Sequence, residues 1–276
     1  MYQEVIYTDI STKIATMSSE KNIICIPLHA HKRVEILRVS SGSAKIQNGK
    51  TIINAQKGDT MFIFPGTPHE CTASDEGVSF DIIMFDLALL KNDIAAFNRY
   101  IEIFENNYFS YSEIIHSQEV SETLDKLYEL SEKYPPKQAN YCSFYILGNI
   151  YILFAELCKC IEERLSTSIY ADKSFGEIIS YINTNYTKNI TTQSISEHFK
   201  YNESYFSRKF KEVTGVSSTK YIHLLRLQHA KALLLKKEAP INQIAKESGF
   251  SDINYFNRCF KKYYGVPPSK ISSIEW

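Results

Sequence analysis

Residues 255–261 read Tyr-Phe-Asn-Arg-Cys-Phe-Lys and repeat the pattern of residues 205–211, which read Tyr-Phe-Ser-Arg-Lys-Phe-Lys. A Gly-Val pair follows both stretches at the same distance. Upstream, Ile-Ser at 195–196 matches Ile-Ala at 244–245, with an offset that is shorter by one residue. This offset places the length difference in a turn between two helices. The sequence therefore predicts two tandem helix-turn-helix units within residues 174–276.

The second helix of each unit is predicted to have an apolar face and a polar face. The apolar residues, at spacings of four and three, are Phe206, Phe210 and Val213 in unit one and Phe256, Phe260 and Tyr263 in unit two. The polar faces hold Ser204, Ser207, Arg208 and Lys211 in unit one and Asn254, Asn257, Arg258, Lys261 and Lys262 in unit two.

These polar faces have the chemistry of DNA recognition. Arginine pairs with guanine and asparagine with adenine in the major groove, whereas lysine and serine mainly hold phosphates. All nine polar residues are therefore predicted to contact DNA, with Arg208 and Arg258 as the principal base-reading groups. Because the serines of unit one are short, base readout there is expected to rest largely on Arg208. The alternative is a helical packing module whose arginines are solvated or ion-paired.

The charge of the chain is divided unevenly between its two parts. The whole chain has no net charge, but residues 173–276 hold 16 Lys and Arg against 8 Asp and Glu, so the remainder is equally acidic. A basic field of this kind is expected of a protein that binds a polyanion. A predicted helix over residues 219–236 separates the units and could place them in successive major grooves, roughly 34 Å apart.

The first part of the chain has a different organisation. Residues 2–85 consist of short β-branched and aromatic runs separated by turns, which predicts a β-barrel or sandwich. Helical periodicity follows, with helices expected at 87–104, 118–133 and 139–164. The amphipathic helix around residues 141–165 is a candidate homodimer surface; equally, it can pack on its own barrel. A Ser/Thr-rich linker is expected at 166–173.

The C-terminal pattern resembles the signature of AraC/XylS-type transcription regulators. The residues that carry the resemblance are Ile244-Ala245-x-x-x-Gly249-Phe250-Ser251-x-x-x-Tyr255-Phe256-x-Arg258-x-Phe260-Lys261-Lys262-x-x-Gly265-Val266-x-Pro268, and it spans about residues 174–271. It departs mainly in unit one, where His198-Phe199-Lys200 stands in the turn. The resemblance implies a sequence-specific DNA-binding regulator controlled by a small-molecule effector.

A second motif lies in the β-rich segment. His29-x-His31-x-x-x-Glu35, followed by His69 after Gly58 and Gly66, resembles the two motifs of cupin barrels. It departs from them at Pro65, which lies one residue late, at Ala73, which replaces an asparagine, and in the missing glycine before His29.

Three interpretations of this motif remain open. The four residues are suitable ligands for Zn²⁺, Fe²⁺ or Mn²⁺. The regulator resemblance instead implies an effector pocket without a metal, formed by His29, His31, Glu35, Arg38 and His69. In the third interpretation the histidines are only hydrogen-bonded at the mouth of the barrel. Arg38 could pair with an anionic ligand or form a surface salt bridge.

The expected fold is therefore α+β with two domains. Its parts are a cupin-like effector-sensing barrel (1–86), a helical segment with the candidate dimer surface (87–165), the linker (166–173) and an all-α domain of two helix-turn-helix units joined by a long helix (174–276). The expected partners are double-stranded DNA, a small-molecule effector such as a sugar or other metabolite, and a second copy of the chain.

Composition excludes several other classes. No apolar run reaches the roughly 18 residues of a membrane span, and the polar N-terminus lacks the features of a signal peptide, so the expected location is the cytoplasm. The six cysteines form no Cys-x-x-Cys pair, which argues against a zinc finger or disulfide framework. We expect a non-enzyme without a cofactor; the alternative is a metal-dependent cupin enzyme fused to a DNA-binding domain.

Overall fold

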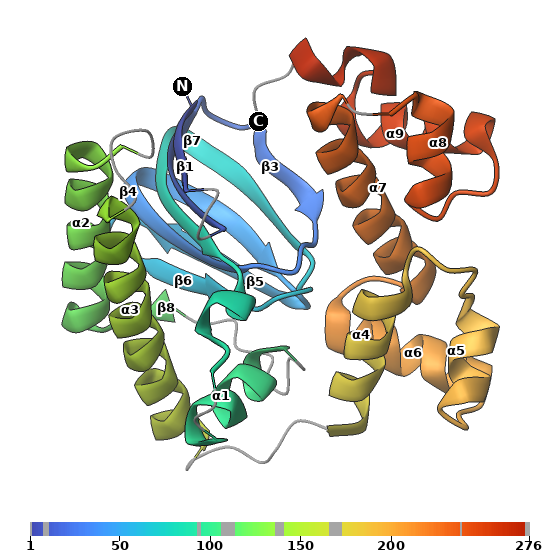
Figure 1. Cartoon of the computed structure of the whole chain (residues 1–276), viewed down its shortest axis with the longest axis horizontal. Coiled ribbons are helices and arrows are strands. Elements are labelled where there is room, and N and C mark those ends of the chain that lie inside the picture. The colour runs from blue at the N-terminus through green and yellow to red at the C-terminus, as the bar shows by residue number, and fades with distance from the viewer. Residues whose placement is uncertain are drawn as a thin grey trace.

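The computed structural model describes residues 2–7, 11–92, 95–105, 114–135, 141–165, 173–237 and 239–273. It confirms the predicted class: a sheet-rich domain with appended helices, followed by an all-helical domain (Figure 1). The predicted linker lies almost entirely outside the described residues, as does the start of the third predicted helix.

The first domain is built on a sheet whose described part has eight strands. They are β1 (Tyr2–Tyr7), β2 (Thr12–Ser19), β3 (Ile24–His29), β4 (Val34–Asn48), β5 (Thr51–Gln56), β6 (Thr60–Ile63), β7 (His69–Phe85) and β8 (Ile114–Ile115). The order is β1-β2-β7-β4-β6-β8, with β3 also paired to β7 and β5 to β4. The long β4 and β7 pair antiparallel, and their register shifts near Gly42. β4 pairs first with β6 and then with β5 along its length, and β7 pairs first with β3 and then with β2. Bends of this kind at the register shifts curve the sheet into a barrel.

Successive residues of the strands face two different cores, as the period of two requires. Leu37, Ile63 and Ile82 point into the barrel, whereas Ile36, Phe62 and Ile83 point to the outer face of the sheet.

Helices cover this outer face (Figure 1). They are η1 (Leu87–Leu90), α1 (Ala95–Glu105), α2 (Gln118–Lys133) and α3 (Cys142–Leu165). Ser117 caps α2 by accepting a hydrogen bond from the backbone N–H of Val120, which explains why this helix begins where the sequence predicts.

α3 is the one helix in the described part of the chain that is long and apolar enough to cross a membrane, over residues 142–162. The sequence analysis found no such run, because Asn149, Glu156 and Lys159 interrupt it. In the structure, Ile146, Leu153 and other apolar residues of α3 pack on the sheet and α2. One face of α3 thus packs on its own domain, and 39% of the apolar stretch is buried.

The second domain contains α4 (Lys173–Asn185), α5 (Thr192–His198), α6 (Glu203–Thr214), α7 (Ser218–Lys236), α8 (Ile241–Glu247), α9 (Ile253–Tyr264) and η2 (Pro268–Ser273). It has two cores, one for each unit, and α7 contributes to both: Leu225 packs in the first, and Leu227 and Leu234 pack in the second. α7 therefore joins the units as a continuous rigid element, as predicted.

One detail of the predicted apolar faces needs correction. Phe206, Phe210, Phe256 and Phe260 are fully buried, but the residues that complete the two stripes are Thr214 and Tyr264. Val213 and Tyr263 are only half-buried. Residues three and four positions after a buried residue lie on the same helix face, so the sequence pattern could not choose between Val213 and Thr214, or between Tyr263 and Tyr264.

The barrel packs directly on the helical domain. Ala30, just after β3, is buried in the core of unit one. The Tyr263 hydroxyl donates a hydrogen bond to the carbonyl of Leu28, and the ammonium of Lys32 lies 5.2 Å from the ring centre of Tyr186. The turn between β4 and β5 also meets the end of α6, where Gly49 and Gly215 approach closely.

Candidate functional site

The two candidate recognition helices, α6 and α9, begin with the same kind of cap. The Asn202 side chain accepts from the backbone N–H groups of Ser204 and Tyr205, and the Asp252 side chain accepts from that of Tyr255. These caps satisfy backbone donors that a helix start leaves free. They begin each helix at the equivalent residue, so the two polar faces are presented in the same register.

The predicted DNA-contacting residues lie on these faces as the repeat requires. Those that are exposed are Ser204, Arg208, Lys211, Asn254, Arg258, Lys261 and Lys262, whereas Ser207 and Asn257 are half-buried. The guanidinium of Arg208 lies 5.8 Å from the ring centre of Tyr205. Among the described residues, neither Arg208 nor Arg258 has a carboxylate partner. Both guanidinium groups thus keep their donors available for an added acceptor.

Two further residues share these faces. Tyr205 and Tyr255 are each 40% exposed, and they occupy equivalent positions in α6 and α9. They are absent from the predicted DNA-contacting residues, although their recurrence in the repeat was a signal that could have identified them.

The units lie at opposite ends of α7 (Figure 1). At about 1.5 Å per residue, a helix of 19 residues spans about 28 Å. This length is comparable to the roughly 34 Å between successive major grooves on one face of the duplex.

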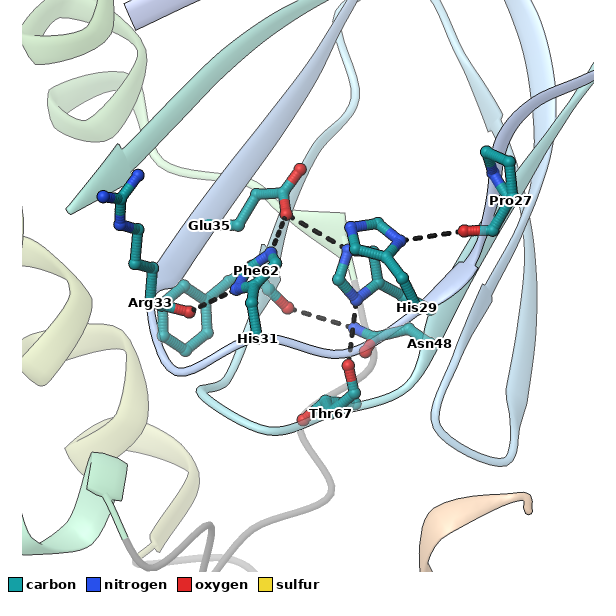
Figure 2. A network of polar contacts seen from close by, with 9 residues as sticks. Pro27, His29, His31, Arg33, Glu35, Asn48, Phe62 and Thr67 are labelled. Carbon is teal, nitrogen blue, oxygen red and sulfur yellow. Dashed lines mark hydrogen bonds and ion pairs between the residues drawn. The ribbon is translucent and has the colours of Figure 1, made fainter. Parts of the chain in front are cut away.

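The structure brings His29, His31, Glu35 and His69 together into one cluster. Their candidate ligand atoms all lie within 4.8 Å of one another. One oxygen of Glu35, Oε2, lies 2.7 Å from Nε2 of His31 and 3.1 Å from Nε2 of His69. In Figure 2 the side chains of His29, His31 and Glu35 point toward one another. The six cysteines are free thiols and none belongs to this cluster.

The backbone of the same segments orients the rings. Nδ1 of His29 bonds to the carbonyl of Pro27, Nδ1 of His31 to that of Arg33, and Nδ1 of His69 to that of Thr67. Each imidazole therefore has its other nitrogen, Nε2, left to face the cluster.

Burial shapes the electrostatics of the cluster. Burial and the neighbouring rings of His69 and His31 hold the pKa of His29 well below its usual range. Burial also lowers the pKa of His31, although Glu35 opposes the shift. For Glu35, burial alone raises the pKa, but His69 and His31 outweigh it and bring the pKa well below its usual range. The two rings that face Glu35 thus favour its ionised form despite burial.

Arg38 does not belong to the cluster, contrary to the expectation that it faces an effector pocket. It shares the face of Ile36, and that face points outward to the covering helices. Its guanidinium bonds to Asp81 at 2.8 Å and to Asp125 of α2 at 2.6 Å, and it lies over the ring of Tyr128. Arg38 faces outward because alternate strand residues face opposite sides of the sheet. Through Asp125 and Tyr128 it holds α2 on that outer face.

A cavity of about 620 Å³ opens beside the cluster, between the two domains. The barrel contributes His29, His31 and Glu35 to its wall, while His69 lies behind them. The helical domain contributes Tyr186, residues of α7 and the end of α9. A cavity of this size suits a small organic molecule. The sequence could not reveal it, since its wall joins segments about 200 residues apart.

Comparison with known proteins identifies the same two parts. A model of the AraC-like ligand binding domain matches residues 22–139, and a model of a helix-turn-helix domain matches residues 195–273. The transcriptional activator RhaS of Mannheimia succiniciproducens is 24% identical over 89% of this chain and 88% of its own. The melibiose operon regulatory protein of Escherichia coli is 23% identical over 89% of this chain and 83% of its own.

Other relatives match over the helical domain or by fold. The regulator YobQ of Bacillus subtilis is 32% identical over 41% of this chain, and YijO of Escherichia coli is 30% identical over 39%. These two alignments span 44% and 38% of those proteins' lengths. The crystal structure of ToxT from Vibrio cholerae has the same fold, with a TM-score of 0.61 and 19% identity over 95% of this chain and 97% of its own.

Proposed function

Because this chain belongs to the AraC family of transcription regulators, we propose that it binds DNA sequence-specifically through both helix-turn-helix units, under the control of a small effector. The observation that carries the proposal is the duplicated basic face of α6 and α9, with Arg208 and Arg258 at equivalent exposed positions. Asn254 and Asn257 accompany Arg258, whereas serines accompany Arg208. We therefore propose that unit two specifies sequence more strongly and unit one mainly positions the protein.

The interdomain cavity is the proposed effector site. A ligand in it would touch the barrel, α7 and the end of α9 at once. Its affinity would therefore differ between arrangements of the two domains, and binding would shift the population toward one of them. This geometry supports control of DNA binding by the effector without any contact between effector and DNA.

The lining favours an organic acid with an apolar body. Four cationic side chains line the cavity against two carboxylates: Lys13, Lys32, Arg33 and Lys231 against Glu35 and Asp86. Met17, Ile26, Ile82, Met84 and Leu225 supply apolar surface. ToxT is similar in fold, and its structures include one bound to an unsaturated fatty acid and one bound to (E)-4-(8-methylnaphthalen-1-yl)but-3-enoic acid. Sugars are the competing class, as the names of the melibiose operon regulatory protein and of the lactose operon transcription activator of Staphylococcus xylosus suggest.

The test is a selection of bound DNA sequences from a random pool, repeated with panels of apolar carboxylic acids and of sugars. We expect one preferred sequence whose affinity changes when an acid is added. Met84→Trp should fill part of the cavity and reduce the acid response at least tenfold, with little effect on DNA affinity in its absence. Ile52→Trp, at an exposed position of β5, is the matched control. A response to sugars alone would reject the acid assignment, and no sequence preference would reject the function.

We propose no catalytic activity and a cytoplasmic location, where the chain would meet DNA. The competing function is a metal-dependent enzyme fused to a DNA-binding domain. It would be supported by a turnover that is lost in His31→Ala while DNA binding persists.

A second copy of the chain is the proposed partner of α3. Besides the face packed on the barrel, α3 exposes an apolar stripe in which Phe144 is 71% and Ile152 is 53% exposed. Tyr141, Tyr145 and Gly148 continue it at helical spacing. Exposed apolar stripes of this kind mark association surfaces.

Introducing glutamate at both Phe144 and Ile152 should therefore convert a dimer to a monomer, since charges would be buried in the contact. Light scattering after gel filtration should give twice the 31.8 kDa chain mass for the wild type and the single mass for the variant. Ile52→Glu, equally exposed but on the barrel, should leave the mass unchanged. A monomeric wild type would reject this partner.

A further inference from the structure

The three clustered histidines share one hydrogen-bonding arrangement. In each ring, Nδ1 lies 2.9–3.1 Å from a backbone carbonyl oxygen, of Pro27, Arg33 or Thr67. A carbonyl oxygen only accepts hydrogen bonds, so Nδ1 must carry the hydrogen in all three rings. In a neutral imidazole with this tautomer, Nε2 has no hydrogen and presents a lone pair. The backbone bonds thus leave the Nε2 lone pair of each ring free to face the cluster.

This arrangement leaves acceptors facing acceptors. Oε2 of Glu35 lies 2.7 Å from Nε2 of His31 and 3.1 Å from Nε2 of His69. Two lone pairs and a carboxylate oxygen repel one another at these distances unless a positive charge lies among them. That charge is either protons on the rings or a cation. If both rings were protonated, His31 and His69 would be two imidazolium ions in a buried site, with ring centres 5.1 Å apart. Burying two like charges so close together is unfavourable.

We propose that His29, His31, Glu35 and His69 bind one divalent first-row transition-metal ion. The inference goes beyond the effector-controlled regulation described above and does not depend on the effector's identity. It selects the metal interpretation from the three that the sequence leaves open for this motif.

The donor set fits such an ion. Three imidazole nitrogens and one carboxylate oxygen suit Zn²⁺ and its neighbours in the first row, whereas Ca²⁺ and Mg²⁺ prefer oxygen ligands alone. Metal-bound histidines characteristically donate their other ring N–H to a carbonyl or carboxylate, as all three rings do here. Ligand atoms on one tetrahedral zinc ion lie about 3.3–3.4 Å apart, since Zn–N distances are about 2.0–2.1 Å. The candidate ligand atoms lie within 4.8 Å of one another, so those farthest apart would have to approach by about 1.5 Å through side-chain rotation when the ion binds.

The position of the cluster leaves the ion accessible from one side. His69 is fully buried, while His29, His31 and Glu35 form part of the cavity wall. A metal held by these four ligands can therefore take a further ligand from the cavity, such as water or a carboxylate.

The experiment uses the full chain, stripped with a chelator and dialysed, with Zn²⁺ alone as the probe. Calorimetric titration and elemental analysis should give one ion per chain. Thermal unfolding should shift upward by about 5–10 °C when free Zn²⁺ is a hundredfold above its Kd. Glu35→Gln, which keeps the size of the side chain, and His29→Gln should each weaken binding at least tenfold.

His229→Gln is the matched control, because His229 lines the same cavity but lies outside the cluster. Its affinity for Zn²⁺ should equal that of the wild type. Circular dichroism of each stripped variant establishes that it is folded before titration. Two results would overturn the proposal: a folded wild type that takes up no stoichiometric zinc, which leaves protons to hold the cluster together, or equal zinc affinity in the wild type, Glu35→Gln and His29→Gln.

Discussion

Arg258→Ala should weaken binding to the preferred DNA sequence about 5- to 150-fold, which corresponds to about 1–3 kcal/mol. It should also remove discrimination at one base pair. The reason is that the Arg258 guanidinium is exposed at the middle of the polar face of α9, with no carboxylate partner among the described residues. Its paired donors are thus free for the two acceptors that guanine presents in the major groove. Fluorescence anisotropy on the selected sequence and on its single-base variants measures both effects.

Two control variants separate base readout from simple loss of charge. Lys262→Ala, on the same helix, should weaken binding to all sequences alike and lower the salt dependence by about one ion, because a lysine there holds phosphate. Lys126→Ala, on α2 of the first domain, should have no effect, since it removes only an exposed ion pair with Glu129. If Arg258→Ala keeps full discrimination at every base pair, α9 does not read sequence through this residue.

The helical domain illustrates which features the sequence could predict. The repeat and the buried phenylalanines both depend on neighbours within two helical turns. Local spacing therefore places them correctly. The choice between Val213 and Thr214 at the end of a stripe depends on what packs above the helix, and the sequence pattern missed it.

The cluster in the barrel was predicted by a mixture of local and long-range signals. His29 and His31 are two residues apart, and on a strand this spacing puts both on one side. That His69 joins them came from a motif resemblance and not from local physics. Arg38 was misplaced because a strand of a covered barrel has two buried faces, so an apolar neighbour such as Ile36 does not identify the inner one.

Contacts between the domains had no sequence signal at all, and the glycines at the ends of α6 and α9 are the clearest case. Gly215 and Gly265 are equivalent in the repeat, with φ of +78° and +75°. Each donates its N–H to a carbonyl one turn back, of Lys211 or Lys261. From sequence, both are simply C-terminal caps, for which glycine is preferred because it adopts positive φ without strain.

Only one of the two also forms an interface. A Cβ on Gly215 would lie 2.3 Å from the carbonyl oxygen of Gly49, in the β4–β5 turn of the barrel, whereas a Cβ on Gly265 would meet nothing within 4 Å. Both alanine variants should therefore lose about 1–2 kcal/mol to backbone strain. Gly215→Ala should lose about 1–3 kcal/mol more, because two backbones must separate.

The comparison of these two variants measures how the domains are coupled. Chemical denaturation should give a lower midpoint for Gly215→Ala than for Gly265→Ala. Gly215→Ala should also show a smaller effect of the effector on DNA affinity, because the barrel and α6 no longer meet at this point. The Gly265→Ala variant controls for cap strain in the denaturation experiment, because nothing lies within 4 Å of its added Cβ; it is not a control for the effector response, since Gly265 lines the interdomain cavity. Equal losses of stability in both variants and an unchanged effector response in Gly215→Ala would mean that the contact between Gly49 and Gly215 does not couple the domains, and control would then pass through the other contacts of the barrel with α7 and α9.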